Sequence, residues 1–208
     1  MNIAIVIPAR LNSTRLKEKM LIKFDDEPLI RVVFDKCRLM GYDTYVVTDS
    51  KKIAQHITIG HVIMTGEAEN GTARIASVVD QLAKYDLIVN IQGDMLDITK
   101  DTIQPIIDNC HSGYITTAYK KGYVSNGVKI IHQNGYACWF TRSNIGYGDS
   151  HLGIYAYTPF LLKRYELYKD KYPMENLEQN RLLGSPYKIR AIEVKYYGKE
   201  INTEQDLF

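Results

Sequence analysis

An uninterrupted apolar run, residues 3–7, opens the chain and stops at Pro8. The run is uncharged and mostly β-branched, a composition that favours a strand with both faces covered. Strands buried on both faces are typical of largely parallel sheets that carry helices on each side. This one feature therefore restricts the chain to folds in which a central sheet is enclosed by helices.

Strand and helix patterns alternate through the first half of the chain, which predicts an α/β fold with a mostly parallel central sheet flanked by helices. Residues 86–92 form a second apolar run and the most buried strand expected. The remaining expected elements are a helix over residues 29–40, strands over 44–48 and 62–64, and a helix from residue 71 to about 83.

The second half of the chain is less regular and predicts a smaller α+β sub-region that covers a cleft over the parallel half. No linker, repeat or charge block interrupts the sequence, so a single domain over residues 1–208 is expected. The expected helices span residues 99–110, 160–169 and 175–183, and the expected strands span 114–119, 128–132, 138–141, 152–158 and 189–194.

Composition limits the classes of function. The formal net charge is only +2, which argues against a nucleic-acid-binding surface over the whole protein. The three cysteines are scattered without a C-x-x-C pair, which favours a reducing compartment and predicts a cytoplasmic protein. Met1 leads straight into the first strand without a signal-peptide pattern, and no apolar run reaches membrane-spanning length, so membrane insertion is not expected.

A basic loop follows the first strand. Arginine side chains and backbone N–H groups at the carboxyl end of a parallel strand suit a polyphosphate ligand. The alternative is an ordinary solvated basic loop, and in either case we expect the cations to be exposed. The polar residues concerned are Arg10, Ser13, Thr14, Arg15, Lys17 and Lys19.

Gln92-Gly93-Asp94 follows the second apolar run, at the same edge of the expected sheet. A carboxylate there suits magnesium, which takes one or two protein carboxylates together with substrate phosphates. Gly93 would let the backbone approach a neighbour closely. The alternative is a turn in which Asp94 caps the next helix.

Weaker candidates lie elsewhere. Gly71-Thr72 and Arg74 open an expected helix, whose N-terminus suits an anion or the edge of a base, or else Arg74 points to solvent. Asp49 is a second candidate, and the alternative is that Thr48-Asp49-Ser50 serves as the N-cap of the short helix that follows. His151 begins a strand on the expected cleft side.

These segments, in this order and along nearly the whole chain, resemble the cytidylyltransferases that activate acidic sugars, most closely the 3-deoxy-manno-octulosonate (Kdo) cytidylyltransferases. The matching segments are Ile7-Pro8-Ala9-Arg10, Ser13-Thr14-Arg15-Leu16 with Lys19, Thr48-Asp49, Gly71-Thr72-Ala73-Arg74, Val89-Asn90-Ile91-Gln92-Gly93-Asp94, Asn126-Gly127-Val128-Lys129, residues 136–142, His151-Leu152-Gly153-Ile154-Tyr155, residues 177–181 and residues 201–207.

The resemblance implies a Rossmann-like nucleotidyltransferase fold and transfer of CMP from CTP to a Kdo-like acidic sugar, with Mg2+ as cofactor and pyrophosphate as the second product. It implies catalytic roles for Arg10, Arg15, Lys19 and Asp94. The nucleotide-binding set adds Pro8, Ala9, Ser13, Thr14, Asp49, Gly71, Thr72 and Arg74. The sugar-binding set is Gln92, His151, Glu178 and Gln179, and the metal ligands are Asp94 and Asn202.

Three departures from the family pattern leave alternatives open. Asn202 stands where the family usually has a second metal-binding aspartate, and Glu18 adds a carboxylate to the phosphate loop. These residues leave two alternative functions open: a nucleotidyltransferase of the same fold with another acceptor or base, and a non-catalytic nucleotide- or sugar-binding homologue. The segment between Arg142 and His151 is shorter than in the family, where it helps to form a dimer, so a homodimer is left open.

Overall fold

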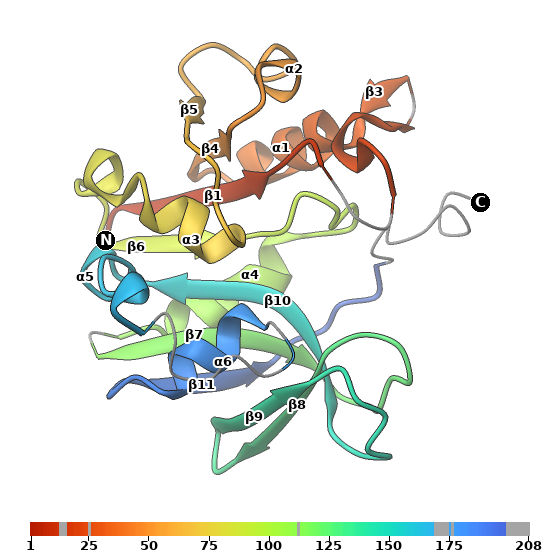
Figure 1. Ribbon diagram of the computed structural model, residues 1–208, viewed down its shortest axis with the longest axis vertical. Coiled ribbons are helices and arrows are strands. Elements are labelled where there is room, and N and C mark those ends of the chain that lie inside the picture. Colours follow the sequence, from red (N-terminus) through yellow and green to blue (C-terminus); the bar gives the residue numbers. More distant parts are fainter. Residues whose placement is uncertain (13–15, 25, 112, 169–174, 176, 199–208) are drawn as a thin grey trace.

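The strand β1 (Ile3–Ala9) lies inside a nine-stranded sheet in the computed structural model of the protein (Figure 1). The structure describes residues 1–208 except 13–15, 25, 112, 169–174, 176 and 199–208. The strands of the first half are β4 (Asp43–Thr48), β5 (Val62–Met64) and β6 (Leu87–Asn90), and its helices are η1 (Lys19–Leu21), α1 (Leu29–Leu39), α2 (Lys51–Ala54), α3 (Gly71–Ala76) and η2 (Val79–Leu82). A small separate hairpin pairs β2 (Lys23–Phe24) with β3 (Glu27–Pro28).

The second half contributes strands to the same sheet. These are β7 (Tyr114–Lys120), β8 (Lys129–Gln133), β9 (Tyr136–Thr141), β10 (Asp149–Tyr157) and β11 (Lys188–Glu193), and the helices are α4 (Lys100–Asp108), α5 (Pro159–Leu162), η3 (Tyr165–Tyr168) and α6 (Glu178–Leu183). The strand order across the sheet is β5-β4-β1-β6-β10-β7-β11-β9-β8.

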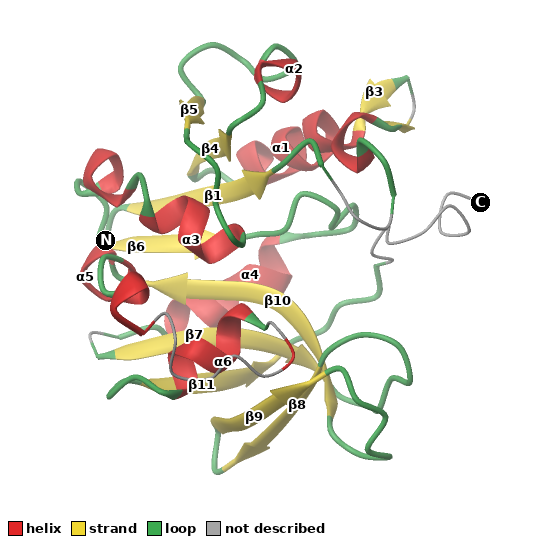
Figure 2. Ribbon diagram, viewed as in Figure 1, coloured by secondary structure: helices red, strands yellow, loops and turns green. Residues whose placement is uncertain are grey.

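The predicted parallel half is confirmed. β1 lies between β4 and β6 and runs parallel to both. Its alternating side chains enter two different cores: Ile5 and Ile7 pack with α1, and Ala4 and Val6 pack with α3 on the opposite face (Figure 2). Since helices cover both faces of this half, a ligand is expected at an edge of the sheet, where the carboxyl ends of β1 and β6 lie.

The prediction of a mostly parallel sheet is wrong for the second half, and the sheet as a whole is mixed. β10 runs antiparallel to β6 and to β7, and β8 and β9 form an antiparallel hairpin. β11 returns parallel to β7. The short turn at Asn134-Gly135 makes β8 and β9 antiparallel, because a short loop can join only antiparallel neighbours. β10 follows β6 and β7 only after long connections, which allow either direction, so the local sequence pattern does not set its direction.

Two predicted helices are interrupted. The helix expected from residue 71 to about 83 ends at Ala76 and is followed by the 3-10 helix η2. The break lies at Val78, which leaves helical geometry with φ of −119° and ψ of 13°. Two successive β-branched residues at this point disfavour continuing the helix. The helix expected over residues 160–169 is likewise divided into α5 and η3.

Candidate active site

The carboxyl ends of β1 and β6 and the start of α3 meet at one edge of the sheet (Figure 1). Pro8 and Ala9 are buried at the end of β1, and Arg10 beyond them is exposed. Gly71 lies against Pro8, because a Cβ on Gly71 would stand 3.0 Å from Pro8 Cγ. The missing side chain therefore lets the start of α3 approach β1 closely.

Lys19 and Asp94 form an ion pair between η1 and the loop after β6. Their side chains are only 8% and 15% exposed, so the expectation that Lys19 is exposed is wrong. Gly93 explains this burial, because its Cβ would collide with Met20 Sδ at 2.7 Å. With glycine there, η1 packs against the end of β6 and carries Lys19 to the carboxylate.

The alternative interpretation of Asp94 as a helix cap is wrong. Thr99 caps α4, where its side chain accepts a hydrogen bond from the Thr102 N–H. Glu18, the carboxylate that departs from the family pattern, pairs with Lys52 Nζ at 3.2 Å on α2. Lys52 therefore balances the charge of Glu18, and Lys19 remains paired with Asp94.

Arg74 on α3 connects the segments that follow β4 and β5. Its guanidinium donates to Asp49 Oδ2 at 2.7 Å and to Thr65 Oγ1 at 2.5 Å. Arg74 is buried, so the alternative in which it points to solvent is wrong. Ser50 caps α2 by accepting from the Ile53 N–H, so the segment Thr48-Asp49-Ser50 does supply the helix cap, while Asp49 itself pairs with Arg74.

The predicted sugar residue Gln92 reaches from the end of β6 to β10, where its Nε2 donates to the Gly153 carbonyl at 3.0 Å. Gly153 has a φ of +67° and lies in an irregularity of the β10–β7 pairing between His151 and Tyr155. A left-handed residue at such a bulge favours glycine. Tyr155 OH in turn donates to Oε1 of the predicted sugar residue Gln179, at 3.2 Å.

Glu178, the first residue of α6, contacts the start of α3. Its Oε2 accepts from the Thr72 N–H at 3.0 Å, and Thr72 Oγ1 hydrogen-bonds Tyr157 OH at 3.0 Å. Asn90 Nδ2 also donates to Tyr157 OH, at 2.9 Å. Burial raises the pKa of the Glu178 carboxyl above its ordinary value, although the Thr72 N–H opposes the rise.

Asn90, Tyr155 and Tyr157 were missed by sequence reasoning. The available signal was an asparagine at the end of a fully buried strand, together with two tyrosines at i and i+2 of a strand, which place both rings on one face. Buried polar groups of this kind need partners, and here they connect β6, β10, α3 and α6.

His151 is buried in the second half of the sheet. Its Nε2 hydrogen-bonds Thr117 Oγ1 at 2.8 Å, and its ring packs edge-on against Phe140 with centroids 4.9 Å apart. Burial lowers the pKa of His151 to about 3. The imidazole is therefore neutral at neutral pH, and its predicted contact with the sugar stays a prediction.

We expect the His151 ring to remain neutral from pH 8 down to pH 5. Because its folded-state pKa is depressed, the unfolded chain binds the proton first, and this residue makes the fold less stable as the pH falls below about 6.5. The measurement is an NMR titration of the imidazole carbon-bound protons, with free imidazole as the reference. A His151 signal that follows the reference curve would contradict the buried placement.

The donor chemistry of the site fits magnesium delivered with a triphosphate. Within the part of the chain that the structure describes, no group of three or more His, Cys, Asp or Glu side chains could hold a metal ion. Asp94 nevertheless supplies one carboxylate, which is sufficient when substrate phosphates and water complete the shell. The predicted residues Ser13, Thr14, Arg15 and Asn202 lie outside the described residues.

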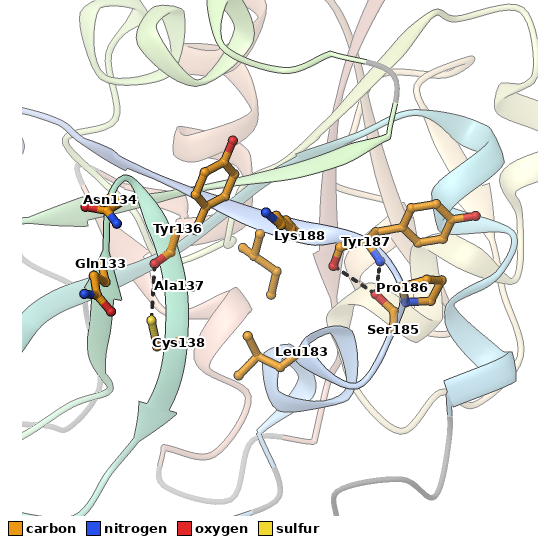
Figure 3. Close-up of a pocket in the computed structure, with 11 residues that line it drawn as sticks. Gln133, Asn134, Tyr136, Ala137, Cys138, Leu183, Ser185, Pro186, Tyr187 and Lys188 are labelled. Atoms are coloured by element: carbon orange, nitrogen blue, oxygen red, sulfur yellow. Dashed lines mark hydrogen bonds between the residues drawn. The ribbon is translucent and has the colours of Figure 1, made fainter.

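A separate cavity of about 460 Å³ lies between the β8–β9 turn and the segment that joins α6 to β11 (Figure 3). β9 contributes Tyr136 and Cys138 to its wall, α6 contributes Leu183, and Tyr187 and Lys188 come from the chain that enters β11. None of the predicted site residues that the structure describes lines this cavity. It is therefore distinct from the edge where β1 and β6 end.

Comparisons with known proteins agree with this architecture. A family model described as cytidylyltransferase matches residues 4–183. A 3-deoxy-manno-octulosonate cytidylyltransferase from Francisella tularensis subsp. novicida is 36% identical, with 99% of this chain and 96% of the relative covered. One from Acaryochloris marina is 33% identical, with 100% and 95% covered.

Among solved structures, CMP:2-keto-3-deoxy-manno-octonic acid synthetase in complex with CTP superimposes with a TM-score of 0.87 at 28% identity. The alignment covers 100% of this chain and 95% of that one. HddC from Yersinia pseudotuberculosis, at 14% identity and a TM-score of 0.77, shares the fold. Within the described ranges, no helix combines the length and apolar character needed to cross a membrane.

Proposed function

This chain belongs to the cytidylyltransferase family, and we propose that it transfers CMP from CTP to 3-deoxy-manno-octulosonate with release of pyrophosphate. The observation that carries the proposal is the largely buried Lys19–Asp94 pair at the edge where β1 and β6 end. It brings a cation suited to phosphate and a carboxylate suited to a divalent ion into one place.

In the proposed reaction, the anomeric hydroxyl of the sugar attacks the α-phosphorus of CTP. The new bond joins the sugar oxygen to phosphorus, the bond to the β-phosphate oxygen breaks, and the hydroxyl proton leaves to solvent. Arg10, Arg15 and Lys19 would stabilise negative charge on the phosphates and on the leaving pyrophosphate. Positioning and electrostatics carry such a transfer, without a covalent intermediate on the protein.

Asp94, with Asn202 as a neutral second ligand, would hold Mg2+. When bound, the ion supplies Lewis-acid polarisation of the α-phosphate. In the structure, the Lys19 ammonium neutralises Asp94, so the carboxylate is already paired before any cation binds. A phosphate oxygen that draws Lys19 away would expose this carboxylate, and we therefore assign magnesium binding to the nucleotide complex rather than to the free protein.

The acceptor side of the site is assigned to Gln92, His151, Glu178 and Gln179. Hydrogen bonds hold three of these side chains in place: Gln92 and Gln179 bond to β10, and Glu178 bonds to α3. The polar surface that would contact the sugar therefore has a fixed shape. A second acceptor is favoured by one observation: an 8-amino-3,8-dideoxy-manno-octulosonate cytidylyltransferase from Shewanella halifaxensis is 32% identical over the full chain. The amino sugar therefore belongs in the same test.

The deciding experiment measures pyrophosphate released by the purified protein from CTP and magnesium, with a panel of sugar acids that includes both octulosonates. Release with Kdo alone supports the first assignment, and release with the amino sugar alone supports the second. CTP binding without release for any acceptor would identify a non-catalytic homologue.

A cytoplasmic location and a homodimer are also part of the proposal. Analytical ultracentrifugation tests the dimer.

We expect CTP with magnesium to raise the melting temperature more than ATP, GTP or UTP at equal concentration. A nucleotide at 100 times its dissociation constant stabilises the folded state by about 2.7 kcal/mol. The selectivity is expected because Arg74, which Asp49 and Thr65 hold in place, and the backbone at the buried end of β1 would read the base. Equal shifts with all four nucleotides, measured by differential scanning fluorimetry, would remove the cytidine assignment.

A further inference from the structure

Lys129 is a fully buried lysine at the start of β8. Its ammonium donates to three backbone carbonyls, those of Ser125 at 3.1 Å, Gly127 at 3.1 Å and Arg142 at 2.8 Å. These three bonds use every donor of the ammonium group. Among the described residues, no carboxylate lies within ion-pair distance of Lys129. The Tyr123 ring also faces the ammonium, with its centroid 5.9 Å from Lys129 Nζ. Burying a cation has a high desolvation cost, which these contacts have to offset.

The three carbonyls belong to two loops that are distant in sequence. Ser125 and Gly127 lie between β7 and β8, and Arg142 opens the loop between β9 and β10 (Figure 1). Gly148, at the end of the second loop, packs closely against Lys129, because a Cβ on Gly148 would stand 3.3 Å from Lys129 Cβ. One side chain therefore fixes both loops where β10 begins.

The start of β10 is connected to the acceptor side of the candidate site. The His151 N–H donates to the carbonyl of Val128, the residue before Lys129, at 2.9 Å. The β10 irregularity follows at once, and its Gly153 carbonyl receives the Gln92 side chain. A displacement of the loops held by Lys129 would therefore move the strand segment that contacts Gln92.

We propose that Lys129 is a positioning residue for the acceptor site. Its ammonium fixes the two loops at the start of β10, and through His151 and Gly153 it sets the position of Gln92. Lys129 belongs to β8, which pairs with the start of β10, whereas the Lys19–Asp94 pair joins η1 to the loop after β6. This inference rests on the proposed transfer to an acidic sugar, and it separates acceptor binding from CTP binding.

The test compares Lys129→Met with Lys121→Met, which makes the same substitution at an exposed position in the loop that leads into β8. Wild-type turnover with CTP and a sugar acid is measured first, and its absence counts against the proposed function alone. Lys129→Met is expected to raise KM for the acceptor at least about fivefold while Kd for CTP changes less than about twofold, since contacts between distant sites are nearly independent. Lys121→Met is expected to match wild type.

Amide hydrogen exchange of residues 149–155 gives a readout that needs no turnover. Exchange there is expected to accelerate in Lys129→Met, while the amides of β1 and β4 keep wild-type protection. If Lys129→Met does not fold, Gly127→Ala replaces it, because Gly127 has a φ of +108° and a side chain strains the carbonyl that the ammonium contacts. Unchanged acceptor KM and unchanged exchange would overturn the proposal, as would an equal loss of CTP binding.

Discussion

Asp94→Asn is expected to lower pyrophosphate release from CTP at saturating magnesium by at least about 100-fold. The substitution removes the one carboxylate assigned to magnesium, and Lewis-acid stabilisation of a phosphoryl transition state is worth several kcal/mol, of which about 1.4 kcal/mol is a factor of ten in rate. The fold should persist, because the asparagine side-chain oxygen still accepts a hydrogen bond from the neighbouring Lys19 ammonium. Initial rates across a magnesium titration provide the measurement.

Asp97→Asn supplies the matched control. Asp97 lies three residues further along the same loop, its side chain is 59% exposed, and its contact with Lys36 is long at 4.0 Å. An exposed pair of this kind contributes little, so wild-type activity is expected. If Asp94→Asn retained the activity of Asp97→Asn, the metal assignment at the end of β6 would be wrong.

The parallel half of the fold could be predicted because its signals are local. β1 and β6 are continuous apolar runs, and a strand buried on both faces has few alternatives of the same length. The predicted loop Gln92-Gly93-Asp94 follows from the same run, since residues just past a parallel strand lie at the ligand edge. Gly93 also fills its predicted role of close approach, against Met20.

The direction of the second-half strands and the partners of the polar residues could not be predicted in the same way. Lys19 and Asp94 are 75 residues apart, and nothing in either local pattern shows that one neutralises the other. The position of Asn90 at the end of a buried strand indicates that its side chain is buried, but the sequence does not show which residue is its partner. These features depend on which strands become neighbours, and that choice is made by tertiary packing rather than by propensity.

Lys19→Ala is expected to weaken CTP binding at least about 10-fold, because a largely buried, charge-assisted contact with phosphate contributes more than about 1.5 kcal/mol. It is also expected to destabilise the free protein by about 1–3 kcal/mol, since it leaves the Asp94 carboxylate without its partner in a nearly buried site. Calorimetric titration with CTP measures the first effect, and denaturant unfolding measures the second.

Two comparisons separate these effects. Lys17→Ala removes a cation from an exposed position two residues earlier, and it should change neither the affinity for CTP nor the free energy of unfolding. The double variant Lys19→Ala/Asp94→Asn should recover part of the lost stability, because the unpaired charge is gone, but none of the lost CTP affinity. Wild-type CTP affinity in Lys19→Ala would show that this lysine serves only to neutralise Asp94, and the phosphate contact would then have to come from Arg10 or Arg15.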